Sequence, residues 1–437
     1  MRIIIIGCGD AGISAAFSAL RENPKAEILV IEKKGYFYPK CPLPFVLEGD
    51  VKIEDIVTPL SKLFANSGIN YETDEVVGVD TENKVVQTKN NRFTYDCLII
   101  ATGSKAVIPP IKGVNLEGVY TLKTLEDTKK IMQRMEKSKE AVIIGGGFIG
   151  CETAASLTNK NISTTIVELL PNLLSPQFDA NFSRIVENKL NENGVRMITG
   201  KSVDEIIGKD EVEAVRVGDE IIACSLVIMS VGVRPDVEFL KTIEVGKFGI
   251  KVDEKLRTSA KGVYACGDCI RIRFMVTNEP QQSGLGTVAE RAGHVAGLNA
   301  AGGDATFYHT LNSMITKIFD LEIGVTGMNE TMAKERGYKV VSGIAKGLSK
   351  PKYYPGGKEL ITKLIYHANI HKLLGAEIAG YEGVDGYLNL ASMAIQKGSI
   401  MDDMLRFRYC YAPPICSAPN PMIPATENAY RKLRRRR

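Results

Sequence analysis

A glycine-rich turn that occurs twice, about 138 residues apart, constrains the fold of this chain more than any other feature. Each copy follows an apolar run typical of a buried parallel strand, and each precedes a helical stretch. An acidic residue closes the next strand in both copies, Glu32 in the first and Glu168 in the second. The sequence therefore predicts a duplicated dinucleotide-binding unit. Its glycines are Gly7, Gly9 and Gly12 in the first copy and Gly145, Gly147 and Gly150 in the second.

Each glycine of the turn has its own physical role. The first permits the turn, the second lets the backbone approach a pyrophosphate, and the third lets the helix pack closely on the strand. The helix N-terminus then offers free N–H groups to the phosphates, and the acidic residue accepts hydrogen bonds from a ribose 2′-hydroxyl. The alternative is a glycine-rich turn in an unrelated α/β fold, which two complete copies disfavour.

Two dinucleotide sites in one chain indicate FAD together with a nicotinamide cofactor. Glu168 disfavours a 2′-phosphate, and the segment Leu169–Asn172 supplies no Arg or Lys to bind one. We therefore expect NADH, with NADPH as the alternative.

The rest of the pattern predicts three domains. Strands that open into glycine turns lie at Tyr95–Ser104, Leu226–Asp236 and Gly262–Cys269. From about Leu321 the pattern changes to alternating strands and amphipathic helices, which is typical of an α+β domain. We expect a discontinuous FAD-binding domain at 1–110 and 242–320, a NAD(P)H-binding domain at 111–241, a third domain at 321–430 and a frayed basic tail at 431–437.

Composition excludes several classes of protein. The net charge of +4 is too small to indicate a polyanion partner for the whole protein. No apolar run approaches the roughly 18 residues that a membrane span needs. The N-terminus lacks a secretory cleavage pattern, and nine scattered cysteines do not form a disulfide framework. We therefore expect a cytoplasmic protein with no membrane partner.

With these motifs the chain resembles the FAD/NAD-linked disulfide reductase superfamily. Within it, the chain is similar to the single-cysteine branch of coenzyme A disulfide reductases, NADH oxidases and peroxidases, and NADH-dependent sulfur reductases. The resemblance covers essentially the whole chain. It implies an α/β fold of the glutathione-reductase type, with two Rossmann-like dinucleotide-binding domains and a C-terminal α+β dimerisation domain.

The resemblance also implies roles for single residues. Asp268 is expected to contact the flavin ribityl chain, a helix at Gln282–Ala301 to point its N-terminus at the flavin, and Phe148 to gate the nicotinamide pocket. The residues expected at the two cofactors are Gly7, Gly9, Asp10, Ala11, Gly12, Glu32, Lys33, Cys41, Ala101, Thr102, Gly103, Gly267, Asp268, Gly145, Gly147, Phe148, Ile149, Gly150, Glu168 and Gly232.

Cys41 is the expected redox-active residue. It lies in a proline-stiffened loop, Tyr38–Phe45, and in the family an equivalent Cys-x-Leu-Pro-aromatic segment starts a helix whose cysteine lies over the flavin. The next cysteine in sequence is Cys97, so one thiol must cycle alone, through a mixed disulfide, a persulfide or a sulfenate. Lys40 is a nearby cation that favours the nucleophilic thiolate. The alternative is a buried structural thiol.

Tyr354 and Tyr411 resemble the pair that coenzyme A disulfide reductases bring near the cysteine, partly from the other subunit. A phenol can donate a proton to a departing thiolate. The resemblance therefore implies a homodimer with an active site shared across the interface. The alternative is that both tyrosines are aromatic core residues.

Several residues depart from the family pattern. Asp10 stands where water-forming oxidases and peroxidases of this branch carry a His, which counts against efficient oxygen or peroxide chemistry. The chain ends before the added rhodanese domain of some sulfur reductases, so we expect the redox cysteine to attack a sulfur-chain substrate directly. Four further thiols could ligate a metal, but their spacing matches no standard site, and we expect buried thiols and no metal. They are Cys266, Cys269, Cys410 and Cys416.

The expected activity is the NAD(P)H-dependent reduction of coenzyme A disulfide, or of a related low-molecular-weight disulfide or polysulfide, through Cys41. The first alternative is an NADH oxidase or peroxidase with a Cys41 sulfenate. An alternative of another class is a redox-sensing flavoprotein scaffold whose basic tail, Arg431–Arg437, binds nucleic acid. The complete cofactor and cysteine set disfavours nucleic acid as a partner, and a solvated tail, or one that attracts the phosphates of coenzyme A, is favoured.

Overall fold

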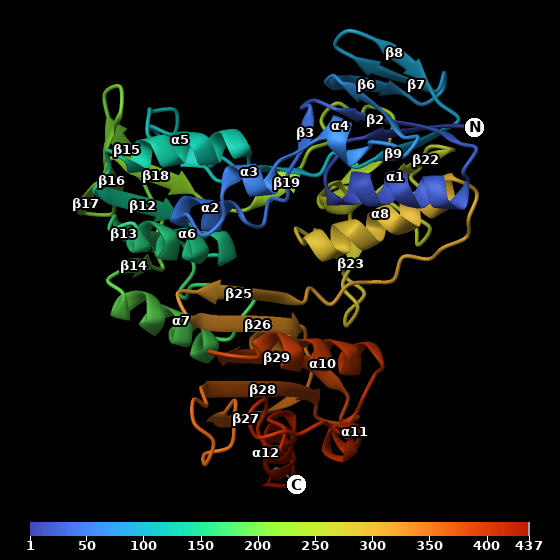
Figure 1. The fold of residues 1–437 in the computed structure, drawn as a ribbon. Coiled ribbons are helices and arrows are strands. Elements are labelled where there is room, and N and C mark those ends of the chain that lie inside the picture. Colours follow the sequence, from blue (N-terminus) through green and yellow to red (C-terminus); the bar gives the residue numbers. More distant parts are fainter. Residues whose placement is uncertain (436–437) are drawn as a thin grey trace. The chain divides into compact units, whose positions relative to one another are not determined.

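The computed structural model describes residues 1–435, and these fold into two compact units (Figure 1). The first unit comprises Met1–Val107, Lys123–Thr128 and Gly232–Thr310. The second comprises Ile108–Leu122, Lys129–Val231 and the residues from Leu311 onward. Each unit therefore contains one of the two glycine-rich turns.

The first unit is built on a parallel sheet with the strand order β22-β9-β1-β2-β5. Its central strand is an isoleucine run whose last four residues are buried, as in sheets that are covered on both faces. The strands are β1 (Arg2–Ile6), β2 (Glu27–Glu32), β5 (Asn70–Thr73), β9 (Cys97–Ile100) and β22 (Val263–Ala265).

Two helices of the first unit, α1 (Asp10–Glu22) and α8 (Gly286–Ala300), lie side by side in Figure 1. Glycines permit this close contact. A Cβ at Gly293 would lie 2.1 Å from the Ala11 carbonyl oxygen, and α8 could not approach α1 with a larger residue there. The helix predicted at Gln282–Ala301 thus exists, but it begins four residues later.

Residues 282–285, the first four of the predicted helix, instead connect a short strand, β24 (Pro280–Gln281), to α8. The other elements of the first unit are β3 (Tyr36–Phe37), α2 (Leu43–Glu48), α3 (Ile53–Ile56), β4 (Thr58–Pro59), α4 (Leu60–Leu63), β6 (Val76–Asp80), β7 (Val85–Thr88), β8 (Arg92–Thr94), β10 (Ser104–Ala106), β19 (Val233–Pro235), β20 (Val245–Gly246), β21 (Gly249–Ile250), the 3₁₀ turn η1 (Gly267–Cys269), β23 (Ile272–Arg273) and β24 (Pro280–Gln281).

The second unit begins with a parallel sheet in the order β11-β18-β12-β13-β14, which repeats the architecture of the first. Helix α5 (Leu125–Met135) starts in the first unit and continues in the second. The other elements of this part are β11 (Val119–Thr121), β12 (Glu140–Ile144), α6 (Phe148–Asn159), β13 (Ser163–Glu168), α7 (Ala180–Glu192), β14 (Arg196–Thr199), β15 (Glu205–Gly208), β16 (Val212–Val217), β17 (Glu220–Ala223) and β18 (Leu226–Met229).

The second unit ends with an antiparallel sheet in the order β25-β26-β29-β28-β27 and four helices (Figure 1). Two parallel-sheet units and an antiparallel C-terminal domain confirm the predicted fold class, while the domain boundaries remain a prediction. The elements are β25 (Met314–Ile318), β26 (Leu321–Gly327), α9 (Glu330–Glu335), β27 (Val340–Leu348), β28 (Glu359–His367), β29 (Leu373–Gly380), α10 (Val384–Gln396), α11 (Met401–Arg406) and α12 (Met422–Arg435).

Helix α12 differs from the expected frayed tail at 431–437, because it continues through Arg435. Its apolar face is buried, and the guanidinium of Arg434 lies 4.9 Å from the ring centre of Tyr430. Basic side chains in the last turn also interact favourably with the helix dipole. Arg436 and Arg437 lie outside the described residues.

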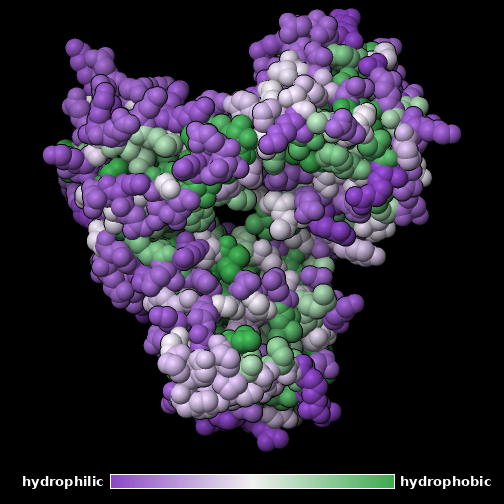
Figure 2. Space-filling model, viewed as in Figure 1, coloured by the Kyte–Doolittle hydropathy of each residue, from purple (hydrophilic) through white to green (hydrophobic). Residues whose placement is uncertain are grey.

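Hydrophilic residues cover much of the surface seen in Figure 2, and apolar residues show between them. Within residues 1–435, no helix combines the length and the apolar character that crossing a bilayer requires.

Candidate active site

An open cavity in the first unit gathers most of the residues expected at FAD. Its open space is about 990 Å³, including the part that is continuous with solvent. Gly12 and Lys33 are not among its lining residues, because Gly12 packs against the backbone of the turn and Lys33 lines a second cavity. The expected residues that do line it are Gly7, Gly9, Asp10, Ala11, Glu32, Cys41, Ala101, Thr102, Gly103, Gly267 and Asp268.

The turn after β1 is shaped to admit a phosphate. Gly7 has a φ of +99°, and a Cβ there would lie 2.5 Å from the Ala101 carbonyl oxygen. A Cβ at Gly12 would lie 2.0 Å from the Gly7 carbonyl oxygen. Gly9, the N-cap of α1, instead faces open space, with no atom within 4 Å of its Cβ position. A pyrophosphate fits here, because the backbone N–H groups at the start of α1 are accessible to it.

Glu32 ends β2 beside this turn. Its carboxylate accepts hydrogen bonds from the backbone N–H groups of Cys8 at 2.8 Å and Lys34 at 3.3 Å. A second cavity of about 770 Å³ open space shares Gly7 and Glu32 with the first and includes Lys33. The two cavities therefore adjoin at the first glycine turn.

Cys41 is exposed and lines the first cavity. It lies two residues before α2, which begins at Leu43 behind the N-cap residue Pro42. An accessible thiol on the wall of a cavity is not a buried structural thiol, so the alternative weighed from the sequence is wrong.

Lys123 is a site residue that sequence reasoning missed. Its ammonium donates a hydrogen bond to the Ser104 hydroxyl at 2.9 Å and lies 4.0 Å from the Asp268 carboxylate. Burial, together with repulsion from Lys40, lowers the pKa of Lys123 to about 8, although Asp268 and Cys41 oppose that shift. A thiolate at Cys41 and a charged Lys123 therefore stabilise each other. No local signal could have identified Lys123, because it is far from Cys41 in sequence.

The lowered pKa of Lys123 predicts a pH dependence of stability. Lys123 binds a proton less tightly in the folded than in the unfolded state, whose pKa is near 10.5. Between about pH 8 and 10.5 the unfolded state holds more protons, so this group's contribution to the free energy of unfolding rises with pH. In urea unfolding of the cofactor-free protein at about pH 8 and about pH 10, which bracket most of this window, the wild type should gain stability relative to Lys123→Met as the pH rises.

The exposed Lys130 on α5 provides the control for this prediction. Lys130→Met should leave the pH dependence of the wild type unchanged. A parallel pH dependence in Lys123→Met and the wild type would contradict the lowered pKa of Lys123.

The second turn, after β12, repeats the geometry of the first. Gly145 has a φ of +107°, and a Cβ at Gly150 would lie 2.0 Å from the Gly145 carbonyl oxygen. Gly147 caps α6 and faces open space. The Glu168 carboxylate accepts a hydrogen bond from the Gly146 N–H at 2.5 Å. Its position at the end of β13 suits recognition of a ribose hydroxyl.

The remaining residues expected at the nicotinamide cofactor lie in two places. Phe148 and Ile149 open α6, and the Phe148 ring packs on Phe178 with ring centres 5.9 Å apart. Gly232 belongs to the first unit, where its carbonyl oxygen accepts a hydrogen bond from the Val107 N–H at 3.0 Å. Gly232 therefore does not share a compact unit with the second turn.

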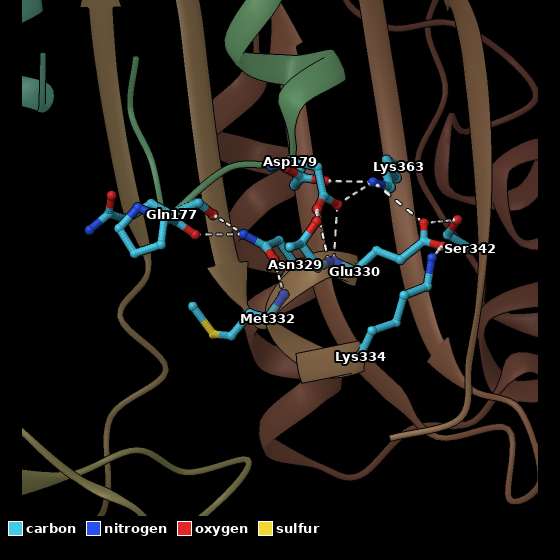
Figure 3. A network of polar contacts seen from close by, with 11 residues as sticks. Gln177, Asp179, Asn329, Glu330, Met332, Lys334, Ser342 and Lys363 are labelled. Carbon is cyan, nitrogen blue, oxygen red and sulfur yellow. Dashed lines mark hydrogen bonds and ion pairs between the residues drawn. The ribbon is translucent and has the colours of Figure 1, made fainter. Parts of the chain in front are cut away.

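A buried ion network, shown in Figure 3, anchors the segment that carries Phe178. The Lys363 ammonium on β28 forms ion pairs with Asp179, with Glu377 at 3.0 Å and with Glu330 at 3.6 Å. The Glu377 carboxyl also accepts a hydrogen bond from the Asp179 backbone N–H at 2.6 Å. Side chains of the C-terminal sheet therefore hold the residue that follows Phe178.

The three carboxyl groups share one ammonium, and the balance between burial and hydrogen bonding gives Glu377 and Asp179 different pKa values. Burial raises the pKa of Glu377 to about 8. Burial also opposes ionisation of Asp179, but the hydrogen bond from Lys363 outweighs it and holds the Asp179 pKa below its usual value. The Asn329 amide completes the anchor by donating a hydrogen bond to the Gln177 carbonyl oxygen at 3.0 Å (Figure 3).

Tyr411 has a hydrogen-bond partner that the sequence did not indicate. Its hydroxyl lies 2.5 Å from the hydroxyl of Tyr353, while the expected roles of Tyr354 and Tyr411 beside the cysteine remain a prediction. The backbone N–H of Tyr354 donates a hydrogen bond to the Pro351 carbonyl oxygen at 2.9 Å and closes the turn that contains Tyr353. Tyr353 is 73% and Tyr411 45% exposed, so these two are not core residues. The hydrogen bond with Tyr353 raises the pKa of Tyr411.

The nine cysteines differ in how far their thiols are exposed to solvent. Within residues 1–435 no disulfide forms, and no three His, Cys, Asp or Glu residues are placed to hold a metal. Contrary to expectation, Cys410 is exposed and Cys416 partly exposed, because the loop after α11 keeps both at the surface. Burial raises the thiol pKa values of six others, namely Cys8, Cys97, Cys151, Cys224, Cys266 and Cys269.

Known proteins share this architecture along most of the chain. The family model described as pyridine nucleotide-disulphide oxidoreductase matches residues 1–293, and the corresponding dimerisation domain matches residues 314–422. The chain is 39% identical, over 447 residues and 99% of each protein, to an NADH oxidase of Methanocaldococcus jannaschii. It is 32% identical, over 431 residues and 96% of each, to an NAD(P)H sulfur oxidoreductase (CoA-dependent) of Pyrococcus abyssi.

A solved structure gives the same result. An NAD-dependent persulfide reductase from A. fulgidus has a TM-score of 0.95 to this chain at 31% identity, and the match covers 99% of this chain and 83% of that one. Both glycine turns, the cavity and the C-terminal sheet lie within the matched residues. The chain therefore belongs to the pyridine nucleotide-disulphide oxidoreductase family, whose members are enzymes that use FAD and NAD(P)H.

Proposed function

We propose that this protein reduces coenzyme A disulfide, or a related low-molecular-weight disulfide or polysulfide, with NADH as electron donor and Cys41 as the single nucleophile. The observation that carries the proposal is the exposed Cys41 thiol on the wall of the cavity that the expected FAD residues line. The names of the relatives from P. abyssi and A. fulgidus, which act on sulfur compounds, support this substrate class.

The proposed reaction is thiol–disulfide exchange at Cys41. FAD, when bound in the cavity, supplies a two-electron relay from the nicotinamide cofactor to sulfur. The Cys41 thiolate attacks one sulfur of the substrate and breaks its S–S bond, so one half departs as a thiolate and the other stays on Cys41 as a mixed disulfide. Two electrons and a proton then release the second thiol and restore the Cys41 thiolate. One NADH and one proton convert one disulfide into two thiols.

The charges around Cys41 support its role as nucleophile. Lys40 and Lys123 line the same cavity and provide positive charge beside the thiolate. Ser104 and Asp268 hold the Lys123 ammonium in place. Cations of this kind favour the ionised thiol, which is the reactive form.

We also propose a homodimer in which each subunit completes the other's active site. The dimerisation-domain match to residues 314–422 supports the dimer. In this dimer Tyr411, with Tyr354, is the proton donor to the departing thiolate. The hydrogen bond between the Tyr353 and Tyr411 hydroxyls helps to position Tyr411.

A second candidate function is the oxidation of NADH by oxygen. It is favoured by the M. jannaschii relative, which is named an NADH oxidase. In that case Cys41 would cycle through a sulfenate, and Asp10 would stand beside it in the lining of the same cavity. Rapid NADH consumption with oxygen alone, giving water, would identify this activity.

The intact mass of the purified, denatured protein, with and without a reductant, tests the proposal. We expect a reductant-sensitive adduct with the mass of one thiol on Cys41, because the mixed disulfide is the proposed intermediate. Additions in steps of one sulfur would indicate a polysulfide substrate. A singly oxygenated Cys41, together with disulfide-independent NADH consumption, would contradict disulfide reduction and favour the oxidase.

A further inference from the structure

Two accessible thiols lie close together on the loop between α11 and α12. The Cys416 thiol donates a hydrogen bond to the Cys410 carbonyl oxygen at 3.5 Å. The Cys416 backbone N–H donates to the Ala412 carbonyl oxygen at 3.0 Å, so the loop folds back on itself between the two cysteines. Cys410 is exposed and Cys416 is partly exposed. The loop therefore places the Cys416 sulfur against the backbone of Cys410, whose own side chain is exposed.

Phenols surround this thiol pair. Tyr411 directly follows Cys410, and its hydroxyl lies 2.5 Å from that of Tyr353. Tyr387 on α10 is half-buried, and both cysteines lie close enough to act on its charge. Hydroxyl groups of this kind can pass protons to and from sulfur during exchange.

Cys410 is exposed like Cys41, and Cys416 is partly exposed, as is Cys97. Burial raises the thiol pKa of Cys97 and of the five buried cysteines, which favours the protonated form that does not attack disulfides. Two thiols are also too few for a closed zinc site, and no third metal ligand joins them among the described residues. A dithiol that reacts with another sulfur compound is the chemistry that this pair can perform.

We propose that Cys410 and Cys416 form a second redox-active site, a dithiol that closes to an intramolecular disulfide by exchange with low-molecular-weight disulfides. That the disulfide which reacts with this pair is also the substrate of Cys41 rests on the proposed function. In the first step one thiolate of the pair attacks the substrate and holds one half as a mixed disulfide, while the other half leaves as a thiolate. In the second step the other thiolate of the pair attacks this mixed disulfide, and the second half leaves.

The exchange is balanced without a further oxidant, because one disulfide becomes two thiols while the dithiol becomes a disulfide. Two molecules of the same thiol reverse it. The pair therefore responds to the ratio of disulfide to thiol, which is the ratio that the Cys41 reaction changes. Disulfide formation constrains the loop that contains Tyr411, so the redox state of the pair affects the position of the proposed proton donor.

The test uses the full-length Cys41→Ser holoprotein, in which Cys410 is exposed and Cys416 and Cys97 are partly exposed. The protein is incubated with excess coenzyme A disulfide, its remaining thiols are alkylated under native conditions, and its intact and peptide masses are measured. We expect Cys410 and Cys416 to lose alkylation together, the protein to lose the mass of two hydrogens, and no coenzyme A to stay attached. Added coenzyme A should restore both alkylations.

The matched control adds Cys416→Ser to the same background. Cys410 should then keep a coenzyme A adduct, because the thiol that resolves it is missing. The proposal is overturned if both cysteines stay alkylated after incubation, or if each carries its own adduct in the protein that has both. The tested variant lacks Cys41, so the result does not depend on catalytic turnover. If the wild type showed no disulfide-dependent NADH consumption, that result would count against the proposed function alone.

Discussion

Cys41→Ser is expected to lower disulfide-dependent NADH consumption by at least about 10³-fold, because a serine hydroxyl is not ionised at neutral pH and cannot form the mixed disulfide. Cys41 is exposed, so the substitution should leave the fold intact. The measurement is the rate of NADH oxidation with saturating coenzyme A disulfide in the absence of oxygen. The FAD content, read from the flavin absorbance, should match that of the wild type.

Cys97→Ser serves as the control for this substitution. Cys97 is the next cysteine in sequence, and burial raises its thiol pKa. This variant should keep most of the wild-type rate. Undiminished turnover in Cys41→Ser would mean that another group receives the electrons and that the single-cysteine reaction is incorrect.

Lys363→Met is expected to lower the free energy of unfolding by about 3–5 kcal/mol, because it leaves buried carboxylates without their counterion. The Lys363 side chain is 4% exposed and pairs with Asp179, Glu330 and Glu377. Denaturant unfolding followed by far-UV circular dichroism measures the loss. Adding Asp179→Asn to this variant should recover part of the stability, since it removes the carboxylate with the lowest pKa.

Lys334→Met provides a matched control on the same network. Lys334 is largely exposed and pairs with Glu330 one helical turn away, so its loss should cost about 0.5 kcal/mol or less. Equal effects of the two substitutions would contradict the counterion role of Lys363.

The same network predicts how stability changes with pH. The pKa of Glu377 is about 8 in the folded state, above its ordinary value of 4.5. Between these two pH values the folded state holds more protons than the unfolded state, so this group's stabilising contribution falls as pH rises toward 8. Glu377→Gln, which resembles the protonated form, should flatten this fall.

Local sequence was sufficient to predict the two dinucleotide-binding units. A turn such as that of Gly7 needs a positive φ, and the close approach of Gly12 to the Gly7 carbonyl excludes a side chain. Both requirements act within a few residues, so a short sequence motif is sufficient to predict them. The parallel strands and the C-terminal antiparallel sheet followed from apolar periodicity in the same way.

Contacts between distant residues could not be predicted, because no short pattern encodes which side chains meet after folding. Lys123 meets Asp268, and Lys363 meets Asp179, only through the packing of separate strands and loops. The hydrogen bond between the Tyr353 and Tyr411 hydroxyls likewise joins two distant segments of the chain.

The sequence by itself determined the fold and the cofactor class, because glycine turns and strand periodicity act over short stretches of chain. The loop around Cys41 predicted the redox cysteine in the same way. Only the tertiary structure decided which charges lie beside Cys41, which tyrosines form a pair, and which thiols remain accessible. Those properties depend on burial and on distances between residues far apart in the chain. Burial raises the pKa of the Cys8 thiol and makes it unreactive, whereas the Cys410 thiol is exposed.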